Sequence, residues 1–235
     1  MKGRAPKTGY DRSRFGAGWT TTPNGCNTRE VVLRRDISSI SLLAGSSECT
    51  VVGGRLADPY TGERVKITKA NISTIDIDHV VSLSDAWQKG AQQWADTKRI
   101  RFANDLRNLL ATGQSINAAK GDNDTASWLP PNRSYRCAFV ARQVTVKTEY
   151  GLAVTEAEKE AMRRVLTRCP RQRLISSNAS RPVKDRQPSP SHHRGRSRSL
   201  DPASLGKRAL TRDSPLARRP SRSLSRWLGQ RELEI

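Results

Sequence analysis

The sequence predicts an α+β domain in which short β-hairpins pack with flanking helices. Within residues 49–67, two short β-branched segments flank Asp58-Pro59-Tyr60-Thr61-Gly62, and this turn chemistry indicates a hairpin. Farther along, hydrophobic side chains recur at the i, i+3, i+4, i+7 spacing of an amphipathic helix, at Met162, Val165, Leu166 and Cys169. Short strands and amphipathic helices in one region favour the α+β class.

The first expected helix begins after Asn27 and ends near Asp36. Asn27 is a favourable N-cap residue, Glu30 stands three residues later, and the hydrophobic residues 31–33 follow. We therefore expect this helix to precede the hairpin.

A strand is expected at residues 72–81. Ile75, Ile77 and His79 alternate with polar residues, which would place Asp76 and Asp78 on the opposite face. Asp78 and His79 could then converge on one site only through a turn or a bulge.

The remaining elements are expected from caps, hydrophobic spacing and glycine stops. They are a helix capped by Ser84 or Asp85, a helix at 97–103, a strand at 108–112, a helical turn at 114–120 ended by Gly121, an amphipathic helix through 135–150, and a closing helix opened by Thr155 and Glu158.

Composition divides the 235 residues into three parts. We expect a lead at 1–25, one domain at 26–169, and a disordered tail at 170–235, because Arg, Ser and Pro dominate the tail and cannot form a core. No apolar run reaches the ~18 residues of a membrane span. The first nine residues are basic and lack the apolar stretch of a signal peptide.

The net charge of +20 is shared by the domain and the tail. The tail has 16 basic and 5 acidic side chains (+11), and the residues before it have 26 and 17 (+9). Such a surface attracts phosphate backbones without base specificity. A solvated cationic surface or a membrane-surface binder would have the same composition, but we expect nucleic acid as the partner.

Four widely spaced cysteines indicate disulfides. None forms a CxxC pair, which argues against a four-cysteine zinc site. Of three possible pairings we favour Cys26–Cys49 and Cys137–Cys169, which would staple the two ends of the domain. Four buried free thiols in a cytosolic protein are the alternative.

The residues that could carry chemistry lie between Asp76 and Lys120. Phosphodiester hydrolysis needs an activated water and stabilisation of developing charge. Asp78 and Asn117 offer the oxygen ligands that hard cations prefer, and a neutral His79 can take a proton from water. Lys120 would share a helix face with Asn117 and pair with a phosphate oxygen.

The combined pattern Asp-x-Asp-His-Val-Val, Asn-Leu-Leu and Asn-x-x-Lys-Gly-Asp resembles the HNH (ββα-metal, His-Me finger) endonucleases. More closely, it is similar to HNH proteins related to the GmrSD C-terminal domain, often exported bacterial proteins. The resemblance extends from about Gly9 to Cys169. Further matching motifs are Asn24-Gly25-Cys26, Asp58-Pro59-Tyr60-Thr61-Gly62, Phe102-Ala103-Asn104-Asp105 and Trp128-Leu129-Pro130-Pro131.

The resemblance implies a strand-strand-helix core with one divalent ion, with Mg²⁺ as the first candidate and Mn²⁺ as an alternative. It makes His79 the general base, Asp78 and Asn117 the metal ligands, and Asn108 the residue that orients the base and its loop. Asp76 matches a nearby auxiliary acid.

Two positions depart from the family pattern. Such proteins usually have Pro three residues after the His, where this chain has Ser82, and often Pro at the position of Leu106. Loss of these rigid turns would loosen the site. No chemical group of the site is lost.

We therefore expect an exported, monomeric, metal-dependent endonuclease that cuts DNA, with RNA as a further substrate and little sequence preference. Arg99, Arg101 and Arg107 are candidate phosphate contacts, or else a solvated helix face. The alternatives are a basic nucleic-acid-binding protein whose nuclease site has decayed, and a disulfide-stapled structural or toxin-like module.

Overall fold

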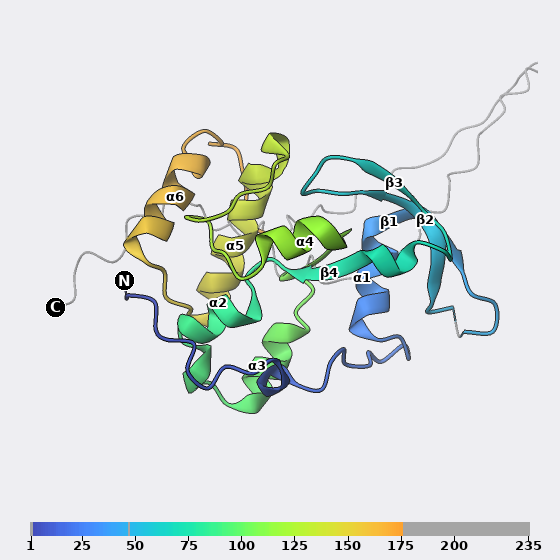
Figure 1. The fold of residues 1–235 in the computed structure, drawn as a ribbon, viewed down its shortest axis with the longest axis horizontal. Coiled ribbons are helices and arrows are strands. Elements are labelled where there is room, and N and C mark those ends of the chain that lie inside the picture. The colour runs from blue at the N-terminus through green and yellow to red at the C-terminus, as the bar shows by residue number, and fades with distance from the viewer. Residues whose placement is uncertain (1, 47, 176–235) are drawn as a thin grey trace, which may run out of the picture. The chain divides into compact units, whose positions relative to one another are not determined.

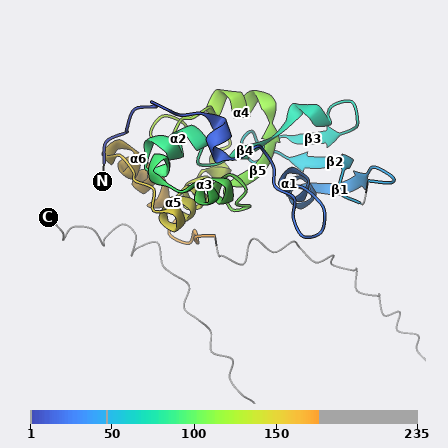
Figure 2. The ribbon, with the colours of Figure 1, turned by 90° about the horizontal axis from the view of Figure 1, so that it is seen from below.

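An antiparallel hairpin followed at once by a helix lies at the centre of the fold. Its parts are β4 (Ile75–His79), β5 (Leu109–Gly113) and α4 (Gln114–Lys120). The register is regular from Ile75 opposite Gly113 to His79 opposite Leu109. Figures 1 and 2 show β4 and α4 between a three-stranded sheet on one side and the helices α2, α5 and α6 on the other. The predicted α+β class with a strand-strand-helix core is confirmed.

The computed structural model describes residues 2–46 and 48–175. Within the described lead, Phe15 is buried, and Thr21 forms an isolated bridge with Asn27. The proposed disordered tail lies outside the described residues from 176 onward, and the domain boundaries stay a prediction. In the described part of the chain, no helix is both long and apolar enough to cross a membrane.

The second sheet has the order β1-β2-β3 and is antiparallel throughout. Its strands are β1 (Ile37–Leu42), β2 (Val51–Ala57) and β3 (Arg64–Ile67). The hairpin β2–β3 was predicted and is confirmed. The strand β1 was missed.

Helix α1 (Thr28–Asp36) joins the two sheets. Asn27 caps it by accepting from the Glu30 amide at 2.9 Å, as predicted. At its other end the Asp36 carboxylate accepts from the Ala111 amide of β5 at 2.9 Å. Because α1 runs directly into β1, this contact ties the three-stranded sheet to the central hairpin.

The helical side of the fold matches the sequence expectation closely. It contains α2 (Leu83–Gln88), α3 (Asp96–Ala103), α5 (Arg136–Tyr150) and α6 (Glu156–Leu166), with short 3₁₀ turns η1 (Arg12–Phe15), η2 (Ile72–Thr74), η3 (Ala91–Gln93) and η4 (Arg133–Tyr135). Thr155 caps α6, as predicted. The cap of α2 was assigned wrongly, because Ser82 caps it rather than Ser84 or Asp85.

The central hairpin contributes to two hydrophobic clusters. Ile75, Ile77 and Leu109 pack with α1 and the three-stranded sheet. Val80 and Leu110 pack with α5 and α6. The hairpin is therefore covered on both faces, and polar side chains that point into either face must find partners inside the protein.

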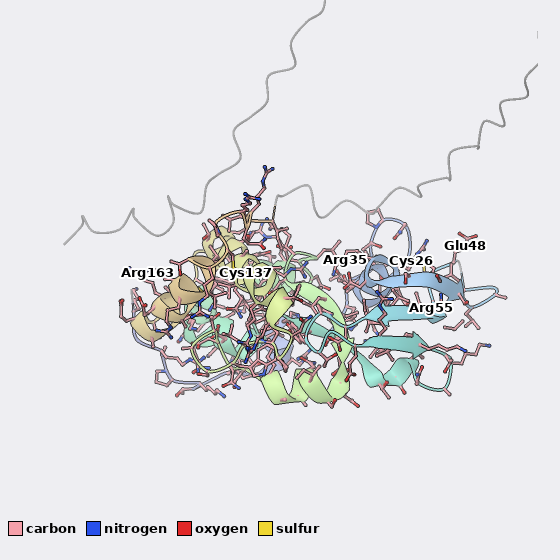
Figure 3. The ribbon with its side chains drawn as sticks, turned by 90° about the horizontal axis from the view of Figure 1, so that it is seen from above. Cys26, Arg35, Glu48, Arg55, Cys137 and Arg163 are labelled. Carbon is pink, nitrogen blue, oxygen red and sulfur yellow. A yellow bond between two sulfur atoms is a disulfide. The ribbon has the colours of Figure 1, made fainter. Side chains whose placement is uncertain are left out.

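Both predicted disulfides are present. Cys26 bonds to Cys49 with a Cα–Cα distance of 5.2 Å, and Cys137 bonds to Cys169 with a Cα–Cα distance of 6.2 Å. Figure 3 shows Cys26 at the sheet end and Cys137 at the helical end. The two bonds staple opposite ends of the described domain, and no described cysteine is free.

Candidate functional site

His79 ends strand β4 and is only 6% exposed. Its Nε2 lies 2.9 Å from the carbonyl oxygen of Ala103. A carbonyl can only accept, so Nε2 carries the hydrogen and Nδ1 carries the lone pair of the neutral ring. The indole of Trp19 stacks on the imidazole, with 5.7 Å between ring centroids and 10° between planes. These contacts fix both the tautomer and the plane of the ring.

The environment also keeps the imidazole neutral. Burial lowers the pKa of His79 to about 4, against the opposing effects of the Ala103 hydrogen bond and the Asp78 charge. At neutral pH the ring is therefore uncharged and able to accept a proton.

Asn108 holds the chain that follows His79. Its side chain accepts from the Val81 amide at 2.8 Å and donates to the Val81 carbonyl at 3.0 Å. The Val80 amide donates to the Asn108 carbonyl at 2.8 Å. Because the Asn108 side chain is fully buried, these bonds are protected from water and clamp the end of β4 against the start of β5.

Ser82, where the resemblance led us to expect proline, is the N-cap residue of α2. Its hydroxyl accepts from the Asp85 amide at 3.0 Å and so caps α2. The turn after His79 is therefore held by a helix cap and by Asn108. At this position the helix cap formed by Ser82 restrains the turn, in place of the rigid ring of the expected proline.

We expect Ser82→Ala to lower the free energy of unfolding by about 1 kcal/mol, the usual cost of losing a cap. Ser82→Pro should cost less, because φ is −61° at this position, which suits proline. The gain in chain stiffness, about 0.4–1 kcal/mol, offsets part of the lost cap. Denaturant unfolding of both variants measures the difference, and a proline variant less stable than the alanine variant would contradict it.

Asp78 lies on the other side of the strand from His79 and is fully partnered. Its Oδ1 accepts from Lys120 Nζ at 2.8 Å, and its Oδ2 accepts from the Tyr60 hydroxyl at 2.5 Å. Lys120 also donates to the His79 carbonyl oxygen at 2.9 Å and has no exposed surface. Burial raises the pKa of Tyr60 well above 10, and the negative charge of Asp78 adds to this, so the phenol keeps its proton.

Asp76 and Asn117 form a second pair on the same side as Asp78. Asn117 Nδ2 donates to Asp76 Oδ2 at 3.0 Å. Both side chains are partly exposed. Asn117 and Lys120, three residues apart on α4, thus contact Asp76 and Asp78, two residues apart on β4.

The pocket that contains His79 does not contain these acids. It has a volume of about 200 Å³, and its polar lining comes from Arg12, Trp19 and His79. The regular register through His79 leaves no bulge to turn Asp78 toward it. The expected convergence of Asp78 and His79 on one site therefore stays a prediction, and it would have to use the turn after His79, where β4 ends. Among the described residues, no cluster of three or more His, Cys, Asp or Glu side chains is arranged to hold a metal.

The three candidate phosphate contacts differ in their surroundings. Arg99 is buried and donates to Asp96 and to the carbonyls of Arg14, Ala91 and Trp94. Arg107 pairs with Asp105 at 2.6 Å. Only Arg101 is exposed, with its guanidinium 5.8 Å from the Tyr150 ring centroid. The guanidinium of Arg99 is thus engaged within the protein, and the assignment of the three arginines as phosphate contacts stays a prediction.

Several residues of the site were missed at the level of sequence. Tyr60 stood in a predicted turn, and Arg12 and Trp19 stood in the lead. Their signal was their place in segments that carry the resemblance, Pro59-Tyr60-Thr61-Gly62 and the segment beginning at Gly9. Nothing in their local spacing indicated that they would reach β4.

Two comparisons with known proteins show what this chain is similar to. Residues 27–165 match the family model described as GmrSD restriction endonucleases, C-terminal domain. A protein of Arthroderma benhamiae described as an uncharacterized secreted protein is 41% identical over 171 residues, which are 72% of this chain and 80% of that protein. The two disulfides fit export as well. The chain therefore belongs to the family of the GmrSD restriction endonuclease C-terminal domain.

Proposed function

We propose that this chain is a metal-dependent endonuclease that hydrolyses phosphodiester bonds of DNA with little sequence preference. RNA is proposed as a further substrate. The observation that carries the proposal is the neutral, tautomer-fixed His79 at the end of β4, in a chain of a nuclease family. The basic domain, with +9 before the tail, supports a polyanionic substrate.

His79 would act as the general base. Its Nε2 is engaged with Ala103, and no described residue donates to Nδ1, so Nδ1 is the atom that would take a proton from the attacking water. Asn108 and Lys120 would keep the His79 backbone in place, through the Val81 clamp and the His79 carbonyl. This assigns positioning roles to both residues.

The residues on the α4 side fit a hard divalent cation in their chemistry. Asp76 and Asn117 bring a carboxylate and a carboxamide together on facing elements at a partly exposed position. Mg²⁺ is commonly held by one or two protein oxygens with water in its other positions. A bound cation would supply Lewis-acid stabilisation of the negative charge that develops on the phosphate. Because both oxygens of Asp78 are already bonded, we propose Asp76 with Asn117 as the holding pair and Asp78 as the partner of Lys120.

The test is nicking of supercoiled DNA in a series of Mg²⁺, Mn²⁺ and EDTA. We expect nicking with either metal and none with EDTA. Asp76→Asn should raise the metal concentration needed for half-maximal nicking. The matched variant Asp78→Asn changes the same chemistry two residues away, and we expect it to lower the free energy of unfolding instead, because it leaves the Lys120 ammonium poorly paired. Nicking that is unaffected by EDTA would contradict the proposed metal dependence.

A second candidate is a nucleic-acid-binding protein without catalytic activity. It is favoured by the pairing of both Asp78 carboxylate oxygens with Tyr60 and Lys120. A gel shift performed beside the nicking assay separates the two. Salt-sensitive binding without nicking under any metal supports the binding protein.

A further inference from the structure

The pocket in front of His79 contains one positively charged side chain, Arg12. This residue lies in η1, is exposed, and lines the pocket together with Trp19 and His79. The lining residues of the pocket include no acidic side chain. The pocket therefore combines a proton-accepting imidazole with an unneutralised positive charge.

The surroundings of Arg12 differ from those of several other arginines in the described part of the chain. Arg99 and Arg107 are tied by ion pairs and hydrogen bonds, and Arg35 is tied to Asp36. The guanidinium of Arg12 forms no hydrogen bond or ion pair with any described residue. A planar guanidinium carries five donors in a geometry that matches phosphate oxygens, so a free one beside a base is suited to binding an anion.

The segment that carries Arg12 is held firmly against the domain. Asp11 caps η1 by accepting from the Ser13 amide at 2.7 Å. At the end of η1, Gly16 has φ of 103°, and a Cβ there would lie 3.1 Å from Ile100 Cγ1 on α3. Phe15 is buried between these elements in the cluster that contains Trp87 and Phe102. The backbone of Arg12 is thereby set in position before any ligand arrives.

We propose that this pocket binds the scissile phosphate and that Arg12 is its direct phosphate contact. The inference rests on the proposed function and adds the residue that binds the reacting group. The arrangement places one phosphate between the guanidinium and the imidazole, so that Nδ1 of His79 faces the water that attacks it. Loss of Arg12 then removes charge stabilisation at the reacting phosphate as well as one ionic contact with DNA.

The test compares Arg12→Ala, Arg12→Lys and the matched control Arg14→Ala. Arg14 is an exposed arginine of the same turn that does not line the pocket, and its guanidinium lies 5.6 Å from the Trp87 ring centroid. Nicking with Mn²⁺ gives kcat/KM. Anisotropy of a fluorescein-labelled DNA duplex in EDTA gives affinity as a function of salt.

Arg12→Ala should lower kcat/KM by about 10²–10³-fold, the range for losing one transition-state donor. It should also lower the slope of log affinity against log salt by about 1. Arg12→Lys should recover the slope and only part of kcat/KM, because ammonium lacks the two-pronged geometry. Arg14→Ala should leave kcat/KM near the wild-type value.

Two results would overturn the inference separately from the proposed function. If Arg12→Ala and Arg14→Ala nick equally well while His79→Ala does not nick, Arg12 is not the phosphate contact and the nuclease proposal stands. If the wild-type chain fails to nick DNA with every metal tested, the nuclease proposal fails. The salt dependence of binding still tests the contact, because equal slopes for Arg12→Ala and wild type would overturn it.

Discussion

Replacing His79 by alanine is expected to slow phosphodiester cleavage by about 10²–10⁴-fold, the range for removal of a general base. The reason is that Nδ1 of this ring is the unshared proton acceptor beside the pocket. Binding of DNA in EDTA should remain, because the neutral ring contributes no charge to the polyanion contact. Rates of plasmid nicking and fluorescence anisotropy measure the two effects.

His79→Gln separates the loss of a base from damage to the fold. A glutamine amide can still donate to the Ala103 carbonyl and still lie against Trp19, but it cannot take a proton near neutral pH. We expect its unfolding midpoint to stay closer to that of the wild type than the midpoint of His79→Ala. Its cleavage should nevertheless be as slow.

Added imidazole provides a further check on the same prediction. The alanine variant has room for a free imidazole, because the missing ring adjoins a pocket of about 200 Å³. Imidazole should restore part of the nicking by His79→Ala and none by His79→Gln, whose side chain fills the space. If His79→Gln cleaves at the wild-type rate, His79 is not the base.

Much of the fold could be predicted because local signals agreed with the tertiary structure. Asn27 and Thr155 are caps in both, and Gly121 ends α4 with φ of 53°. Strand β1 was not predicted because its pairing with β2 is irregular. Ser39 has φ of 49°, and the register shifts between Ser38 and Ser41, so the strand shows no clean alternation.

For the candidate site, the sequence predicted only which side chains of β4 share a face. Alternation correctly separated Asp76 and Asp78 from Ile75 and Ile77. The partners that decide what each group can do come from distant segments. Tyr60 reaches Asp78 from the hairpin turn, and Trp19 reaches His79 from the lead. No local period encodes such contacts.

A buried cluster of charges beneath α2, α5 and α6 was missed for a related reason. Its buried members are Lys89, Lys147, Asp85, Asp124 and Glu158, and the exposed Arg4 pairs with Asp85 and Asp124 from the lead. Lysines are ordinarily surface residues, and their sequence context gives no sign of burial. In the fold they link four separate segments, which only the tertiary structure brings together.

Glu158→Gln is expected to destabilise the domain by about 3–5 kcal/mol, the cost of removing one partner from a buried ionic group. Glu158 has no exposed surface and accepts from Lys89 at 2.5 Å and from Lys147. Glutamine keeps the shape but turns an amide NH₂ toward one of the ammonium groups. The two buried ammonium groups would then have only Asp85 and Asp124 as buried anionic partners. Chemical denaturation with a two-state fit measures the loss.

Glu160→Gln is the matched control on the same helix. Its side chain is 45% exposed and lies 3.7 Å from Arg163 and 3.8 Å from Arg164, so its removal should cost less than about 1 kcal/mol. If the two variants lose equal stability, the buried cluster is not what holds α6 to α2 and α5. A large loss confined to Glu158 would instead show that the helical side depends on balanced charges as well as apolar packing. Asp85 is a second carboxylate that pairs with both Lys89 and Lys147, so it balances the same two buried charges as Glu158.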